Sequence, residues 1–271
     1  MPCTPQMLAQ RDRFDALYAR AGAPVMQAIE RRVCGCAYGG SSWTTRAEAE
    51  RIAARLGLRP GVRLLDVGAG AGWPALYIAG TTGCDATLVD LPLGGLHIAA
   101  ARAAADGLAA ACRCAVADAA ALPFRDASFD AVSHSDLLCC LEDKAGALAA
   151  CRRVLRPGGT MVFSVILVPP GLAPEDHRRG VENGPEFIDS DRDYPTLLDE
   201  TGWRVVERRD ITADYAVSCG RQLEADLAHA EELRALVGPA EYAERVAGWR
   251  SKRDAIGEGL LRRALFTVAP R

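Results

Sequence analysis

The chain has 271 residues, of which 49% are hydrophobic, so it can bury a substantial core without disulfides or metal ions. Its formal net charge of -3 at pH 7, with basic residues scattered among acids, argues against a nucleic-acid partner, which would need a basic face. The N-terminus lacks the pattern of a signal peptide, and no apolar stretch is long enough to span a membrane. We therefore expect a cytoplasmic protein that binds neither nucleic acid nor a membrane.

Ten cysteines are present, and six of them form the close pairs Cys34/Cys36, Cys112/Cys114 and Cys139/Cys140. These spacings do not match the two CxxC or Cys/His pairs of a structural zinc site. In the reducing cytoplasm we interpret the cysteines as small buried hydrophobic residues, and we expect no bound metal.

Residues 1–60 are predicted to be helical. Thr45 followed by Glu48 is typical of a capping box, and apolar residues then recur at helical spacing over residues 49–56. Gly57 is placed to end this helix.

From residue 62 the pattern changes to strands that alternate with helices. Apolar runs predict strands at Val62–Val67, Ala86–Asp90, Cys112–Val116, Phe129–Ser133 and Thr160–Leu167. Helical patterns over 97–105 and 143–155 lie between some of them, the second capped by Asp143. Such alternation predicts a parallel sheet with right-handed crossovers and helices on both faces.

The last third of the chain has a different pattern. Residues 168–193 are rich in Pro, Gly and charge and are predicted to form an ordered loop or lid. A short helix at 194–200 and a strand at 203–208 follow. Two amphipathic helices are predicted within 221–256, before a final strand at 260–268.

A glycine-rich loop follows the first predicted strand, in the segment LLDVGAGAG at residues 64–72. The strand delivers Asp66, and glycines then occupy positions 68, 70 and 72. Glycine allows a close approach of backbone to a ligand and tolerates unusual torsion angles. In a parallel sheet this first strand-to-helix turn lies at the crevice where ligands bind.

Three further residues indicate what the loop binds. Trp73 occupies the position at which the dinucleotide fingerprint GxGxxG has its third glycine, which disfavours a nicotinamide dehydrogenase. Asp90 ends the second strand, where a carboxylate can accept hydrogen bonds from both ribose hydroxyls. Asp118 follows the third strand, where it is suited to an adenine amino group.

The segments DVGAGAG, LVDLP, VADAAALPFRDASFDAV and RRVLRPGG occur in this order within about residues 40–168. Together they resemble the class I S-adenosylmethionine-dependent methyltransferases of the ubiquinone-biosynthesis type. The resemblance implies a Rossmann-like α/β fold, with a seven-stranded, mostly parallel sheet whose last strand is antiparallel. It also implies methyl transfer from S-adenosyl-L-methionine to a small-molecule acceptor, with S-adenosyl-L-homocysteine as product.

By this resemblance the cofactor contacts would come from Asp66, Gly68, Ala69, Gly70, Gly72, Asp90, Leu91, Asp118, Ala119, Ser133 and His134. The glycine loop would flank the methionine and ribose, and Asp90 would hold the ribose. Asp118 and Ala119 would contact the adenine, while Ser133 and His134 would face the methionine. Asp66 would orient the loop or the amino group.

Residues 38–46 resemble the segment that closes over the cofactor in many relatives, and they include Trp43. Arg46 could hold the methionine carboxylate or could be an exposed arginine at a helix start. Trp73 could pack on the cofactor or lie in the core.

A general base is needed only if the acceptor keeps its proton at the working pH. His134, directly after the fourth predicted strand, is the first candidate, although it could merely contact the substrate or a carbonyl. Asp136 is the second, with a helix cap as its alternative. Tyr215 and His177 lie in the predicted lid regions and could line the acceptor pocket or lie elsewhere.

The sequence is divided into three parts. Residues 1–58 would close over the cofactor, 59–168 would form the cofactor-binding core, and 169–271 would complete the core. In that last part the core portions are 194–211 and 259–271, and the lid insertions are 169–193 and 212–258. We expect a monomer or homodimer with a small, partly apolar substrate.

Two functional alternatives remain open. The cysteine pairs could serve methylation of a thiol or a metalloid. The chain could also bind S-adenosylmethionine without transferring its methyl group.

Overall fold

The computed structural model describes residues 4–38 and 42–271. In this part of the chain a seven-stranded sheet has the strand order β3-β2-β1-β4-β5-β7-β6. The strands are β1 (Arg63–Val67), β2 (Asp85–Asp90), β3 (Cys112–Val116), β4 (Phe129–Ser135), β5 (Leu155–Leu167), β6 (Trp203–Asp210) and β7 (Arg262–Pro270). Strands β1 to β5 pair in parallel, and β7 is antiparallel to both β5 and β6. The predicted fold is confirmed.

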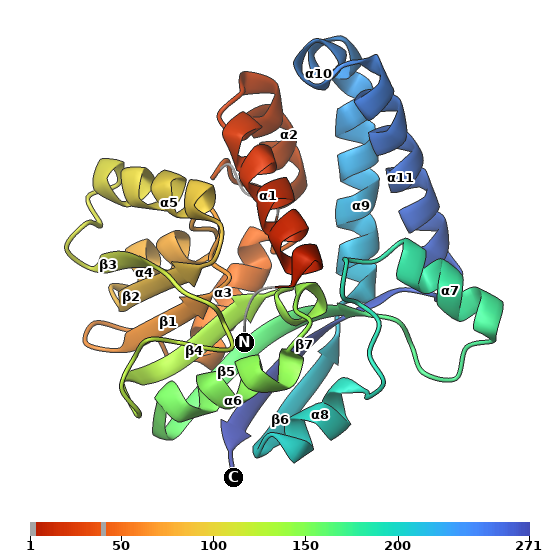
Figure 1. Cartoon of the computed structure of the whole chain (residues 1–271). Coiled ribbons are helices and arrows are strands. Elements are labelled where there is room, and N and C mark those ends of the chain that lie inside the picture. The colour runs from red at the N-terminus through yellow and green to blue at the C-terminus, as the bar shows by residue number, and fades with distance from the viewer. Residues whose placement is uncertain (1–3, 39–41) are drawn as a thin grey trace.

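Helices cover both faces of the sheet, and a further group stands beyond one end of it (Figure 1). They are α1 (Pro5–Arg20), α2 (Pro24–Cys34), α3 (Arg46–Arg55), α4 (Ala75–Thr82), α5 (Leu93–Ala105), η1 (Leu138–Cys140), α6 (Lys144–Val154), α7 (Pro174–Glu182), α8 (Tyr194–Glu200), α9 (Thr212–Ala228), α10 (Ala230–Val237) and α11 (Pro239–Gly257). Helix α2 packs against α9 and α11 through a cluster that includes Val33, Leu223 and Val246. The N-terminal helices and the predicted lid therefore meet.

The sheet is buried on both faces, as its near-continuous apolar strands require. Successive side chains of a strand point to opposite faces. Leu64 and Leu65 of β1 accordingly belong to two different core clusters, and so do Leu88 and Val89 of β2. Among the described residues, no helix is both long enough and apolar enough to cross a membrane.

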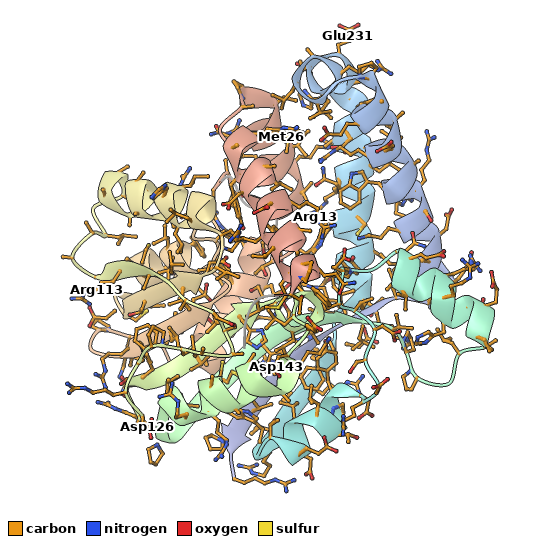
Figure 2. All side chains as sticks on the ribbon, in the orientation of Figure 1. Arg13, Met26, Arg113, Asp126, Asp143 and Glu231 are labelled. Atoms are coloured by element: carbon orange, nitrogen blue, oxygen red, sulfur yellow. The ribbon has the colours of Figure 1, made fainter. Side chains whose placement is uncertain are left out.

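Two predicted helix starts are confirmed by their caps. Asp143 lies at the start of α6 (Figure 2), and its side chain accepts a hydrogen bond from the Gly146 N–H. The Thr45 side chain accepts one from the Glu48 N–H. The predicted capping box is nevertheless only half formed, because the Glu48 carboxylate binds Arg263 instead of returning to the helix start.

Two parts of the later chain differ from the prediction. Residues 168–193 contain α7, which begins at Pro174 and carries ion pairs from Arg178 to Glu175 and Glu182. This helix is supported by charge pairs rather than by apolar periodicity, which is why the hydrophobic pattern missed it. The two helices predicted within 221–256 are three, because the helical structure is interrupted at His229 and again at Gly238. The first of them, α9, already begins at Thr212.

Candidate functional site

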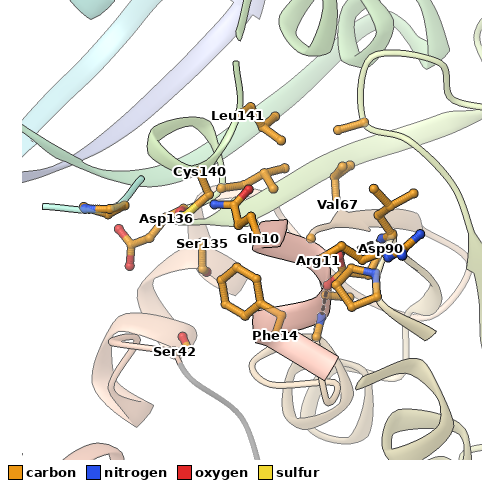
Figure 3. A pocket seen from close by; sticks show the side chains of 18 of the residues that line it. Gln10, Arg11, Phe14, Ser42, Val67, Asp90, Ser135, Asp136, Cys140 and Leu141 are labelled. Atoms are coloured by element: carbon orange, nitrogen blue, oxygen red, sulfur yellow. Dashed lines mark hydrogen bonds between the residues drawn. The ribbon is translucent and has the colours of Figure 1, made fainter. Parts of the chain in front are cut away.

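A cavity of about 460 Å³ lies beyond the carboxyl ends of the strands, covered by α1 (Figure 3). Its volume is in the range of a small-molecule site, and its place between β1 and β4 is where the strand order reverses. The walls come from the turns after β1, β2, β3 and β4, from one face of α1, and from two residues of α11. Segments from both ends of the chain therefore complete a site whose floor is the central sheet.

The glycine loop after β1 forms one wall of the cavity. Gly68 and Gly70 adopt φ angles of 73° and 52°, in the left-handed region that favours glycine. A Cβ atom on Gly70 would lie 2.6 Å from the Tyr18 hydroxyl, and one on Gly68 would lie 2.8 Å from Leu137 Cδ1. A side chain at either position would therefore be strained by the backbone angle and would have to displace Tyr18 or Leu137.

Asp90 at the end of β2 is fixed against this loop. Its Oδ2 accepts a hydrogen bond from Gly70 N at 2.7 Å, and its Oδ1 accepts one from Leu91 N at 2.8 Å (Figure 3). Burial raises the pKa of Asp90 to about 6, while the two N–H donors act in the opposite direction. Each carboxylate oxygen keeps a further lone pair, so the pair of oxygens can still accept bonds from two hydroxyls.

Asp66 lies beneath the same loop and is 2% exposed. Ser133 Oγ donates a hydrogen bond of 2.6 Å to Asp66 Oδ1. Burial raises the pKa of Asp66 to about 7, and the Ser133 hydrogen bond lowers it. Asp66 lines the cavity, whereas Ser133, predicted to face the methionine, does not line it and instead binds Asp66.

Asp118 and Ala119 line the cavity in the turn after β3. The Asp118 Oδ1 accepts a hydrogen bond of 2.9 Å from Ala120 N, which holds the turn. Leu91 lies in the wall formed by the end of β2, the strand that pairs with β3. The residues predicted for the ribose and the adenine are therefore brought together in one cavity.

Asp136, in the turn after β4, lines the cavity with a φ of 53°. The Nε of Arg263 in β7 donates hydrogen bonds to both carboxylate oxygens of Asp136, at 2.9 and 3.1 Å. The same guanidinium donates to the two Glu48 oxygens at 2.8 and 2.9 Å, and to Ser164 Oγ at 2.9 Å. Asp136 is therefore held by a buried arginine and does not cap a helix.

The core of the chain matches the family described as "Methyltransferase domain" over residues 65–163. A demethylmenaquinone methyltransferase of Beutenbergia cavernae is 34% identical in an alignment that covers 58% of this chain and 72% of that protein. The chain belongs to the class I S-adenosylmethionine-dependent methyltransferases.

Other similar proteins extend this comparison. A phosphoethanolamine N-methyltransferase of Triticum aestivum is 26% identical over 78% of this chain, and the chain spans only 41% of its length. A phosphoethanolamine N-methyltransferase 2 of Haemonchus contortus, solved with S-adenosylhomocysteine, superposes with a TM-score of 0.77 at 23% identity, over 95% of this chain and 60% of that one. The [4+2]-cyclase SpnF superposes with a TM-score of 0.75 at 25% identity, over 99% of this chain and 97% of that one.

His134 does not lie where a base in this methyltransferase would be useful. It is 1% exposed, it stacks on Phe163 with ring centroids 4.6 Å apart, and it does not line the cavity. Neither ring nitrogen has a hydrogen-bond partner among the described residues, and burial lowers the pKa of His134 to about 3. The geometry therefore gives no support to the predicted cofactor contact or to the predicted base.

The segment around Trp43 contributes to the cavity, but not through the predicted arginine. Arg46 lies over the ring of Tyr77, 5.2 Å from its centroid, and is not part of the cavity wall. Trp43 lines the cavity, and its ring meets the ring of Tyr215 edge-on, with the two centroids 5.4 Å apart. Tyr215 is buried behind Trp43. The predicted catalytic role of Tyr215 therefore has no support, and His177 pairs with Asp189 at an exposed position.

Trp73 combines the two roles left open by the sequence. It is 5% exposed, packs against Tyr38 and Tyr77, and also borders the cavity. Its Nε1 donates a hydrogen bond of 2.6 Å to the Thr44 carbonyl oxygen, which ties the segment before α3 to the glycine loop. Gly72, at the foot of this loop, packs on Leu76 and does not line the cavity.

Sequence reasoning missed the residues that reach the cavity from remote parts of the chain. Helix α1 contributes Gln10, Phe14 and Tyr18, which are four residues apart. This spacing places them on one face of a helix and could have been recognised in the sequence. On α11, Trp249 and Lys252 are three residues apart and line the cavity together. No sequence signal connects either helix with the glycine loop.

Proposed function

We propose that this chain transfers the methyl group of S-adenosylmethionine to a small, partly apolar acceptor. The observation that carries the proposal is the fixed carboxylate of Asp90, held by the loop N–H of Gly70 in a cavity that also contains Asp118. When bound there, S-adenosylmethionine supplies a methyl carbon that is already strongly electrophilic. Alignment of the acceptor and exclusion of water are then the main tasks of the protein.

The residues divide into two groups along the cavity. Asp90 would hold the ribose hydroxyls, Asp118 with Ala119 the adenine, and Asp66 with the glycine loop the methionine. Trp43 and Asp136 would border the acceptor. We retain Asp136 as the candidate that receives a hydrogen bond or a proton from the acceptor, because it lines the cavity and Arg263 fixes its carboxylate.

The predicted division of the chain is part of this proposal. Helices α1 to α3, within residues 1–58, would close over the cofactor, and α1 already covers the cavity. The lid insertions 169–193 and 212–258 would enclose the acceptor, and residues of both line the same cavity. The net charge of -3 supports a protein without a nucleic-acid partner, and we propose a cytoplasmic monomer or homodimer.

The relatives are named for different acceptors, so we infer the class of acceptor from the residues that line the cavity. Similarity to the demethylmenaquinone methyltransferase supports the ubiquinone-biosynthesis type, and the wheat relative is named for phosphoethanolamine. An aromatic wall of Trp43 and Trp249 favours an acceptor with an apolar body. Methylation of a thiol or metalloid by the cysteines receives less support, because burial raises the pKa of Cys34 to about 12 and that of Cys112 to about 11.

The test is binding of S-adenosylmethionine measured by calorimetry, followed by detection of S-adenosylhomocysteine with pooled metabolites as acceptors. Asp90→Asn should weaken binding about tenfold or more, because it removes a charged acceptor of hydrogen bonds. Asp254→Asn, an exposed aspartate on α11, is the matched control and should bind normally. Unchanged binding in Asp90→Asn would contradict the assignment of the cofactor site.

A second function is favoured by one observation. The cyclase SpnF superposes on 99% of this chain with a TM-score of 0.75. A protein with this fold can therefore be named for a reaction other than methyl transfer. The chain would then bind S-adenosylmethionine and act on its substrate without methyl transfer. Conversion of a substrate without any S-adenosylhomocysteine would favour this function, and stoichiometric S-adenosylhomocysteine would exclude it.

A further inference from the structure

One lysine in the cavity wall has no anionic partner. The chain has 32 basic residues, and only Lys144 and Lys252 are lysines. The Lys144 ammonium donates to the carbonyl oxygens of Leu141 and Phe187 at 2.9 and 2.7 Å. Lys252, in contrast, makes no hydrogen bond or ion pair with any residue that the structure describes, and it lines the cavity.

The other cations near the cavity are already matched by acids. Arg13 on α1 pairs with Glu186 at 3.7 Å, and Arg11 binds Asp12 at 2.7 Å. Arg263 is neutralised by two carboxylates behind the wall. Lys252 therefore leaves one unmatched positive charge, which balances the whole charge of a monoanion but only half the charge of a phosphate dianion.

The surroundings of Lys252 make this unmatched charge costly. Burial lowers the pKa of Lys252, and the positive charge of Arg13 acts in the same direction. A desolvated ammonium is stabilised when an opposite charge comes close to it. An anionic group on a bound molecule would provide that charge.

Aromatic surface lies directly beside the ammonium. The Nζ of Lys252 is 5.5 Å from the centroid of the Trp249 ring. Trp249 is fixed by a hydrogen bond of 2.8 Å from its Nε1 to Asp226, and it meets Trp43 edge-on at 5.4 Å. Both indole rings line the cavity, so a cation and an apolar wall are offered to the same molecule.

We propose that the acceptor is a monoanion whose carboxylate pairs with Lys252 while its apolar body lies against Trp43 and Trp249. This inference rests on the proposed function in so far as the bound molecule is the methyl acceptor. The recognition itself requires no methyl transfer, so the two can fail separately.

The experiment measures affinities for a panel of aromatic and straight-chain carboxylates, each compared with its neutral amide, in the presence of S-adenosylhomocysteine. At least one carboxylate should bind about tenfold or more tightly than its amide, the size expected for a charge-assisted hydrogen bond. Lys252→Met should abolish this preference, and Lys252→Arg should retain it. Arg250→Met removes an exposed charge from the same helix and should leave the preference unchanged.

A second measurement uses the unaltered protein. Acetylation of Lys252 by acetic anhydride can be read by peptide mass spectrometry, because the chain has a single other lysine. The preferred carboxylate should slow acetylation of Lys252, and its amide should not. Equal binding of every carboxylate and its amide, or a preference that survives in Lys252→Met, would overturn the proposal. Anion recognition without S-adenosylhomocysteine formation would refute only the proposed methyl transfer.

Discussion

The buried ion cluster behind the cavity provides the sharpest test of how the site is held. Arg263 is 1% exposed and joins Glu48 of α3 to Asp136 of the β4 turn. Arg263→Met would leave two carboxylates without their cation, and breaking a buried pair in this way typically costs about 3–5 kcal/mol of unfolding free energy. Since a whole domain is stable by about 5–15 kcal/mol, this one substitution should approach the limit of folding.

Urea unfolding, monitored by circular dichroism, measures this loss of unfolding free energy. Glu48→Gln combined with Arg263→Met should recover part of the stability, because one stranded charge is then removed. Burial already raises the pKa of Glu48, and Arg263 lowers it. Without Arg263, the variant should therefore be least impaired at low pH, where Glu48 is neutral, and lose stability as the pH rises through the raised pKa.

The neighbouring Arg262 is the control, because it is 53% exposed and pairs with Asp210 at 3.5 Å. Arg262→Met should cost about 1 kcal/mol or less, as surface ion pairs do. The reasoning is refuted if Arg263→Met costs no more than this control, or if the double variant is less stable than Arg263→Met alone.

Three further predictions concern the cavity and the core. Gly70→Ala should reduce S-adenosylmethionine affinity and melting temperature together, because its Cβ would meet the Tyr18 hydroxyl at 2.6 Å; an unchanged melting temperature would contradict this. His134→Phe should preserve S-adenosylhomocysteine formation. It should also remove the stability loss that His134 causes in the wild type as the pH falls from 6.5 toward 3, because in that range the His134 ring takes up a proton only in the unfolded chain. Lost turnover in the folded His134→Phe variant would restore the base. Cys140→Ser, in the cavity wall, should leave turnover unchanged, and inactivity would revive the thiol alternative.

Most of the residues predicted to bind the cofactor line one cavity, because they lie at strand ends along one stretch of chain. Strand β3 (Cys112–Val116) and helix α8 (Tyr194–Glu200) have the predicted bounds. Asp90 ends β2 and Asp118 follows β3, and these two strands are neighbours in the sheet, so position along the chain was enough to bring the two residues together.

The residues predicted to face the methionine were wrong by two positions, because the end of one strand was predicted two residues too early. Strand β4 was predicted to end at Ser133 but continues to Ser135. Ser133 and His134 therefore lie within the strand, where one binds Asp66 and the other packs on Phe163. The residues that line the cavity are those two positions later, Ser135 and Asp136. Strand ends are set by the pairing partners as well as by local pattern, and no single stretch of sequence contains both.

By itself, then, the sequence determined the glycine loop, Asp90, Asp118 and the order of the strands along the chain, because strand geometry brings neighbouring turns to one edge of the sheet. Only the tertiary structure decided which remote segments meet at the cavity. Trp43, Asp136 and Lys252 come from segments more than 90 residues apart, and their positions depend on helix packing and on the buried Arg263. Such contacts between remote segments depend on how whole elements pack, so local patterns do not reveal them.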